Sequence, residues 1–145
     1  MNILKVTEIL PITDKEAISL PYFEVGVSAG HPTYVSEYFE TTINVSRELI
    51  KNRNSTFCVR VNGQSMIDAG IDDGDLLIVD KSLPAENNNI ILAVINGEFT
   101  VKRLYKRDDD LYLQPENKNY NPIKITPFMD FRIWGVVTGL IKKLL

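Results

Sequence analysis

The sequence predicts a mostly β protein: a compact antiparallel β-sheet domain with one short helix and an extended N-terminal arm. Two observations lead to this fold class. Short apolar segments rich in β-branched and aromatic residues recur after residue 55. Turn-forming dipeptides, Asp73-Gly74 and Asn96-Gly97, separate several of them. The 145 residues are enough for one domain of ordinary size.

The first 32 residues are expected to form the extended arm. Pro11, Pro21 and Pro32 interrupt this stretch, and Gly26 and Gly30 lie between them. Too few apolar residues recur at helical spacing to define a stable helix. The arm is therefore predicted to be extended rather than helical.

One short helix is expected between Asn44 and Asn52. Asn44 is a favourable N-cap residue, and Val45, Leu49 and Ile50 fall on one side of the helical turns that follow.

Seven β segments are expected after this helix. Their predicted bounds are 56–61, 76–79, 90–95, 99–105, 111–113, 123–125 and 131–141. Asn96 and Gly97 both tolerate the positive φ angles of a type I′ turn, so segments 90–95 and 99–105 should pair antiparallel. The acidic run at 108–110 is expected at a solvated hairpin tip.

Composition excludes several classes of protein. Hydrophobic residues make up 44% and charged residues 24%, as in a soluble globular protein, and no run of about 18 apolar residues occurs. We therefore expect no signal peptide and no membrane span, and the presence of one cysteine favours a reducing, cytoplasmic location. The net charge of -3 supplies no positive field for DNA, so no direct sequence-specific DNA binding is expected. A single cysteine, Cys58, excludes an intrachain disulfide and a multi-cysteine metal site; neither a metal nor a cofactor is predicted.

Catalysis, if present, needs a base other than histidine. The only histidine, His31, lies between Gly30 and Pro32 in the arm, where nothing orients it. A lysine can act instead when burial lowers its pKa and leaves a neutral amine.

Ser65 and Lys102 are the candidate pair. Ser65 lies in a glycine-containing turn after segment 56–61, which can expose a hydroxyl and nearby backbone N–H groups. Lys102 follows the Asn96-Gly97 turn, and strand alternation places it on one face with Thr100 and Leu104. A serine after a turn glycine usually only completes the turn, and a strand lysine usually faces water. Alone, neither residue identifies a site.

The wider pattern resembles a known family. Residues 61–80, VNGQSMIDAGIDDGDLLIVD, resemble the nucleophile region of the LexA/UmuD family of self-cleaving Ser–Lys peptidases of the bacterial SOS response. Residues 96–104, NGEFTVKRL, look like that family's lysine region, at a similar separation, and residues 134–137, WGVV, look like its C-terminal strand. The fold implied is the family's C-terminal β domain.

The resemblance also implies the site and the organisation of the chain. Ser65 would be the nucleophile and Lys102 the neutral general base, with the N–H groups of Gln64 and Ser65 as the oxyanion hole. The family cuts itself at a small residue followed by glycine, which Ala29 and Gly30 supply. Residues 1–29 would then be a cleavable arm, and residues 30–145 a peptidase and dimerisation domain.

Arm length then suggests a branch of the family. Repressors of the family carry an N-terminal helix-turn-helix domain, whereas about 29 residues precede this cut, so a UmuD-like role in SOS mutagenesis is expected. The resemblance implies stimulation by a RecA filament on single-stranded DNA. It also implies a truncated homodimer that joins a Y-family, UmuC-like translesion polymerase.

Three alternatives remain open at this point. The chain could be an uncleaved structural accessory subunit of such a polymerase, or a self-cleaving repressor-like protein that lacks a DNA-binding domain. It could also be a signal-peptidase-like Ser–Lys enzyme, although the membrane anchor usual in that class is not seen. Val136, Val137, Leu140 and Ile141 fit either a dimer interface or the core.

Overall fold

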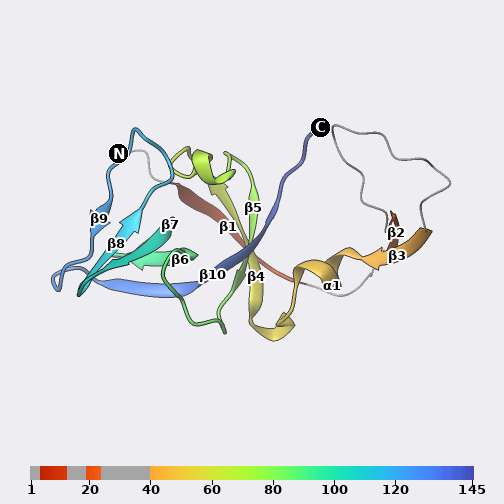
Figure 1. Ribbon diagram of the computed structural model, residues 1–145, viewed down its shortest axis with the longest axis horizontal. Coiled ribbons are helices and arrows are strands. Elements are labelled where there is room, and N and C mark those ends of the chain that lie inside the picture. Colours follow the sequence, from red (N-terminus) through yellow and green to blue (C-terminus); the bar gives the residue numbers. More distant parts are fainter. Residues whose placement is uncertain (1–3, 13–18, 24–39) are drawn as a thin grey trace. The chain divides into compact units, whose positions relative to one another are not determined.

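The computed structural model describes residues 4–12, 19–23 and 40–145, and Figure 1 shows the elements that they form. The chain divides into two compact units. The larger consists of residues 1–12 and 52–145, and the smaller of residues 13–51.

The larger unit is an eight-stranded antiparallel sheet with the strand order β1-β4-β5-β10-β6-β7-β8-β9. Its strands are β1 (Lys5–Pro11), β4 (Thr56–Asn62), β5 (Leu76–Asp80), β6 (Ile90–Ile95), β7 (Glu98–Arg107), β8 (Asp110–Gln114), β9 (Ile123–Lys124) and β10 (Phe131–Ile141). The predicted mostly β, antiparallel fold is therefore confirmed. All seven predicted strands after residue 55 are present, with ends shifted by at most two residues.

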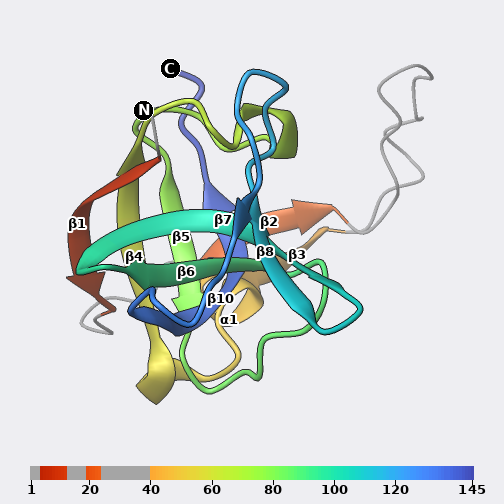
Figure 2. The same ribbon diagram turned by 90° about the vertical axis from the view of Figure 1, so that its left-hand side faces the viewer.

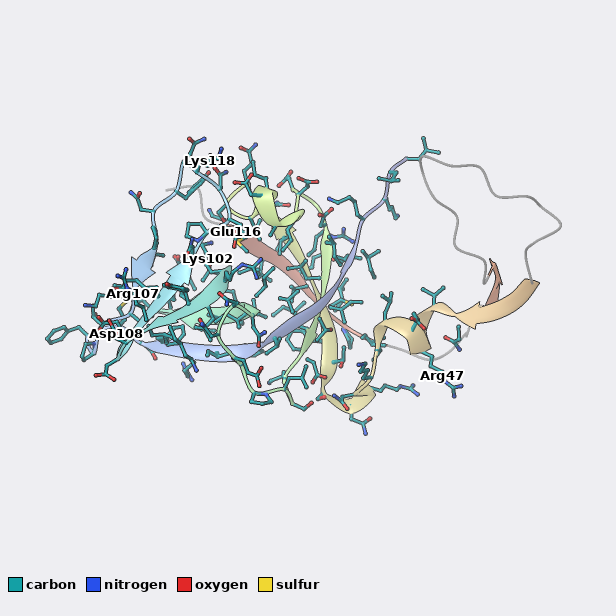
Figure 3. The ribbon with its side chains drawn as sticks, in the orientation of Figure 1. Arg47, Lys102, Arg107, Asp108, Glu116 and Lys118 are labelled. Carbon is teal, nitrogen blue, oxygen red and sulfur yellow. The ribbon has the colours of Figure 1, made fainter. Side chains whose placement is uncertain are left out.

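The β6–β7 hairpin forms at the predicted turn. Asn96 has a φ of 50° and Gly97 a φ of 85°, and Ile95 pairs with Glu98 across the two-residue loop. The acidic run also lies at a hairpin tip, because Arg107 pairs with Asp110. Figure 3 shows Arg107 and Asp108 together at that end of the sheet.

The smaller unit contains the β2–β3 hairpin and one helix. Strands β2 (Ser19–Phe23) and β3 (Glu40–Asn44) pair antiparallel, and α1 (Val45–Leu49) follows directly. The Asn44 side chain accepts a hydrogen bond of 3.0 Å from the Arg47 N–H, which caps the helix as predicted.

Strand β1 was not predicted as a sheet strand, although it falls in the expected extended arm. It lies at the edge of the sheet, where Val6 pairs with Val61 and Ile9 with Val59 of β4. The paired residues lie 46 to 57 positions apart in the sequence, so no local pattern predicts this ladder.

The sheet curls strongly, as Figure 2 shows, and its edge strand β1 contacts β7. Without this curl, β4 and β7 would lie four strand positions apart. The main core cluster lies inside the curl and is made of Leu4, Val59, Val61, Met66, Ile71, Leu77, Val79, Leu92 and Val101. A second cluster comprises Ile91, Ala93, Leu104 and Leu113.

The C-terminal apolar residues divide between core and surface. Val136 is buried and Val137 packs against the main core, whereas Leu140 and Ile141 are exposed. In the described ranges, no helix is long and apolar enough to cross a membrane. The same ranges contain no group of three or more His, Cys, Asp or Glu side chains that could hold a metal ion.

Gly135 of β10 provides a test of packing inside the sheet. A Cβ there would lie 2.6 Å from Val79 Cγ1 and 3.0 Å from the Asp80 carbonyl oxygen, and Val79 is fully buried. We expect Gly135→Ala to lower the free energy of unfolding by about 1–3 kcal/mol through overpacking. At Gly139 the nearest atom is the end of the Ile78 side chain, 3.1 Å away, so Gly139→Ala should cost less. Chemical denaturation of both variants measures this, and equal losses would contradict the prediction.

Candidate active site

Ser65 lies in the turn that follows β4 and is completely buried. Gly63 starts the turn with a φ of 116°, a conformation that favours glycine, and its N–H donates to Asp73 Oδ1 at 2.8 Å. A short 3₁₀ helix, η3 (Ile67–Ala69), ends the turn. The chain therefore reverses sharply on both sides of Ser65 and presents its hydroxyl to the interior.

Lys102 extends from the middle of β7 to this hydroxyl. Its Nζ lies 3.0 Å from Ser65 Oγ, 3.0 Å from Thr100 Oγ1 and 3.0 Å from the Val101 carbonyl oxygen. Only 2% of the Lys102 side chain is exposed. Figure 3 shows it within the fold rather than at the surface. The sequence placed Thr100 on the same strand face but did not identify it as a partner of the amine.

Burial lowers the pKa of Lys102 to about 8. The cause is desolvation, because the ammonium form loses its hydration and none of its three hydrogen-bond partners is a carboxylate. A neutral amine has two N–H donors and one lone pair. It can donate to Thr100 and Val101 and accept from the Ser65 hydroxyl. The site is thus arranged for proton transfer from Ser65 to Lys102.

A third contact to the hydroxyl comes from the N-terminal segment. The Leu4 N–H donates to Ser65 Oγ at 3.0 Å, and Leu4 is completely buried in the main core. Because 61 positions separate the two residues, sequence patterns gave no sign of this contact.

A loop after β8 holds the turn that carries Ser65. The Glu116 carbonyl accepts from the Asp68 N–H at 2.8 Å, and the Glu116 N–H donates to Met66 Sδ at 3.3 Å. Asn117 Nδ2 donates to the Gln64 carbonyl oxygen at 2.8 Å. Glu116 also forms an ion pair with Arg103, the residue after Lys102. One loop therefore connects the serine turn to the lysine strand.

The structure brings together three of the predicted site residues. Ser65 and Lys102 are in contact, and Gln64 lies in the same turn, with an exposed side chain and a carbonyl that faces Asn117. Ala29, Gly30 and His31 lie outside the described residues.

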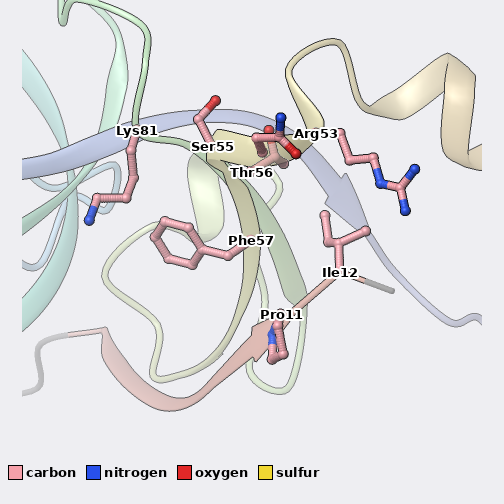
Figure 4. Close-up of a pocket in the computed structure, with 8 residues that line it drawn as sticks. Pro11, Ile12, Arg53, Ser55, Thr56, Phe57 and Lys81 are labelled. Atoms are coloured by element: carbon pink, nitrogen blue, oxygen red, sulfur yellow. The ribbon is translucent and has the colours of Figure 1, made fainter. Parts of the chain in front are cut away.

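A surface pocket lies elsewhere on the larger unit. It is lined by residues 11–12 and 53–57 and by Lys81, as Figure 4 shows. These residues surround the beginning of β4, whereas Ser65 follows its end. The pocket is therefore separate from the Ser65–Lys102 pair.

A family model and individual relatives both match most of this chain. Residues 21–138 match the family described as Peptidase S24-like. The LexA repressor of Clostridium novyi is 43% identical over 133 residues, which cover 92% of this chain and 64% of the relative. The LexA repressor of Caldicellulosiruptor saccharolyticus is 44% identical over 118 residues, or 81% of this chain and 56% of the relative. The chain thus spans less than two thirds of the length of these relatives.

The lowered pKa of Lys102 predicts how stability depends on pH. Between pH 8 and 10.5 the unfolded chain holds a proton on Lys102 that the folded chain has lost, so stability should rise with pH across this window. Below pH 8 both states are protonated, and burial of the charge costs about 3 kcal/mol. We expect the stability of Lys102→Met relative to the parent protein to be greatest at pH 7 and to fall by about 3 kcal/mol by pH 10.5.

Denaturation at a series of pH values measures this difference. Lys106→Met is the control, because Lys106 is exposed on the same strand. Parallel curves for Lys102→Met and the parent protein would exclude a lowered pKa.

Proposed function

This chain belongs to the Peptidase S24-like family, and from that membership we propose that it is a peptidase that cleaves itself, with Ser65 as nucleophile and Lys102 as general base. The observation that carries the proposal is the 3.0 Å contact between Lys102 Nζ and Ser65 Oγ, both buried. A surface lysine would remain charged at neutral pH and could not accept the proton.

The proposed reaction proceeds through an acyl-enzyme. Lys102 Nζ takes the hydroxyl proton as Ser65 Oγ attacks the carbonyl carbon of Ala29. The tetrahedral intermediate collapses, the bond from Ala29 to the Gly30 nitrogen breaks, and Lys102 returns the proton to that nitrogen. Water, deprotonated by Lys102, then attacks the ester, and Lys102 returns this proton to Ser65 Oγ as the acyl–oxygen bond breaks. The products are residues 1–29 and 30–145, and one water is consumed.

The oxyanion of the intermediate needs donors close to Ser65. The N–H groups of Ser65 and Gln64 are the proposed pair, because both belong to the turn that carries the nucleophile. Among the described residues, the Ser65 N–H donates to no backbone carbonyl, as a donor to an oxyanion requires.

Of the expected biological roles, the repressor-like one now has more support. The relatives that match over most of this chain are named LexA repressor, whereas the UmuD-like role rested on the length of the arm. We therefore favour a self-cleaving, LexA-like regulator over a subunit of a translesion polymerase. Assembly as a homodimer and stimulation by a RecA filament on single-stranded DNA belong to this proposal; a Y-family polymerase partner belongs only to the UmuD-like role.

Self-cleavage can be measured by intact mass. We expect the parent protein at pH 9 to yield two fragments whose masses sum to that of the chain plus one water, while Ser65→Ala and Lys102→Ala remain whole.

Because the pKa of Lys102 is about 8, the rate should rise up to about pH 8–9, and at pH 7 it should be about a tenth of the plateau. Lys106→Ala is the lysine control. A RecA filament should raise the rate at pH 7.

Other outcomes would identify the alternatives. A parent protein that stays whole at every pH, with and without the filament, would favour an uncleaved accessory subunit. Cleavage of an added exported precursor by an otherwise intact chain would favour a signal-peptidase-like enzyme. Cleavage that persists in Ser65→Ala would exclude Ser65 as the nucleophile.

A further inference from the structure

We infer that Asn117 is a positioning residue for the oxyanion hole, an inference that rests on the proposed function. The Asn117 side chain is buried, and its Nδ2 donates to the Gln64 carbonyl oxygen at 2.8 Å. The Ile67 N–H donates to the same oxygen at 3.3 Å. Two donors thus fix the direction of this carbonyl.

The direction of the Gln64 carbonyl fixes the direction of the Ser65 N–H. The two groups belong to one trans peptide, in which the C=O and N–H point in opposite directions. Holding the Gln64 oxygen toward Asn117 therefore points the Ser65 N–H away from Asn117. Rotation of this peptide plane would remove the donor from the developing oxyanion, where one donor is commonly worth about a hundredfold or more in rate.

The orientation of the Asn117 amide follows from a second contact. Its Oδ1 accepts a hydrogen bond of 2.9 Å from the Asn119 N–H, so the Nδ2 must be the group that faces Gln64. This arrangement allows a precise substitution. Aspartate at position 117 keeps the acceptor for Asn119 and the side-chain shape, loses the donor to Gln64, and adds a negative charge that Asn119→Asp also adds two residues away.

The test compares pH–rate profiles of self-cleavage. We expect Asn117→Asp to lower the plateau rate about tenfold to a hundredfold with an unchanged midpoint, because the lysine still titrates normally. Asn119→Asp is the matched control, since Asn119 is exposed and contributes only its backbone N–H. Asn117→Ser, too short to reach Gln64, should behave like Asn117→Asp and serves if the aspartate variant melts below the assay temperature.

A second measurement separates this inference from the proposed function. A fluorophosphonate reacts with Ser65 by displacement of fluoride and needs the same oxyanion donors, but not the arm. Its labelling rate should fall in Asn117→Asp in parallel with cleavage. Unchanged plateau and labelling rates, or a shifted midpoint at constant plateau, would overturn the role of Asn117. A parent protein that is labelled but never cleaved would instead overturn self-cleavage.

A separate observation supports a second inference: we propose that the Leu4 segment is an intramolecular plug of the site. The Leu4 N–H donates to Ser65 Oγ at 3.0 Å, and Ser65 is completely buried, whereas attack on a carbonyl needs that carbon within about 3–3.5 Å of the same oxygen. A scissile peptide can therefore reach Ser65 Oγ only if a group that covers it, such as Leu4, moves away. The plug is held by burial of the Leu4 side chain and by the pairing of β1 with the edge of β4.

Weakening the plug should accelerate the reaction. We expect Leu4→Ala, which loses buried contacts, and Leu4→Pro, which lacks the N–H donor, to raise fluorophosphonate labelling and self-cleavage at pH 9 about tenfold. Ile9→Ala is the control, because Ile9 is exposed on β1, the strand that follows Leu4. Melting curves establish that each variant is folded at the assay temperature.

The two readouts again separate the hypotheses. Labelling that stays constant or falls in both Leu4 variants would show that Leu4 supports the site rather than blocks it. Faster labelling in a chain that is never cleaved would retain the plug and overturn self-cleavage.

Discussion

The contact between a buried lysine amine and a serine hydroxyl is the constraint on which the rest of this structure depends. Lys102 can act on Ser65 only where water is excluded, because hydration would restore its usual pKa. Exclusion of water requires a closed core around β4 and β7, which are not neighbours in the sheet. The curl that brings β1 to β7 closes this core. The same curl brings the end of β4, which precedes Ser65, to the middle of β7, where Lys102 lies.

The short serine turn is held by residues from distant parts of the chain. Asp73 fixes Gly63, Glu116 fixes Asp68, and Asn117 fixes the Gln64 carbonyl. Each of these bonds restrains backbone, so the direction of N–H groups is controlled as closely as the position of the hydroxyl. That is what electrostatic stabilisation of an oxyanion requires, because donors that must first reorient contribute less.

Local signals in the sequence predicted most of the fold. The Asn96-Gly97 turn and the Asn44 cap act through their own backbone angles and hydrogen bonds, and both were found where expected. The choice of Ser65 and Lys102 needed the family resemblance, since a turn serine and a strand lysine are individually ordinary. Leu4 and Asn117 could not be found at all. Their roles depend on contacts across 61 and 53 positions, which only the closed sheet creates.

Two independent restraints then act on the same hydroxyl. A pKa of about 8 leaves only about a tenth of Lys102 neutral at pH 7, and the Leu4 contact requires displacement before any carbonyl can approach. A molecule can react only if its Lys102 is neutral and its Leu4 is displaced from Ser65. The reactive fraction is therefore the product of the neutral fraction and the fraction with Leu4 displaced. Alkaline pH raises the neutral fraction of Lys102 and leaves the Leu4 contact in place. A protein activator that binds the open form would relieve the second restraint without changing the lysine, since a ligand shifts a conformational equilibrium only by its preference for one state. High pH and an activator should therefore be additive in free energy, so that the gain from the activator is as large at pH 9 as at pH 7.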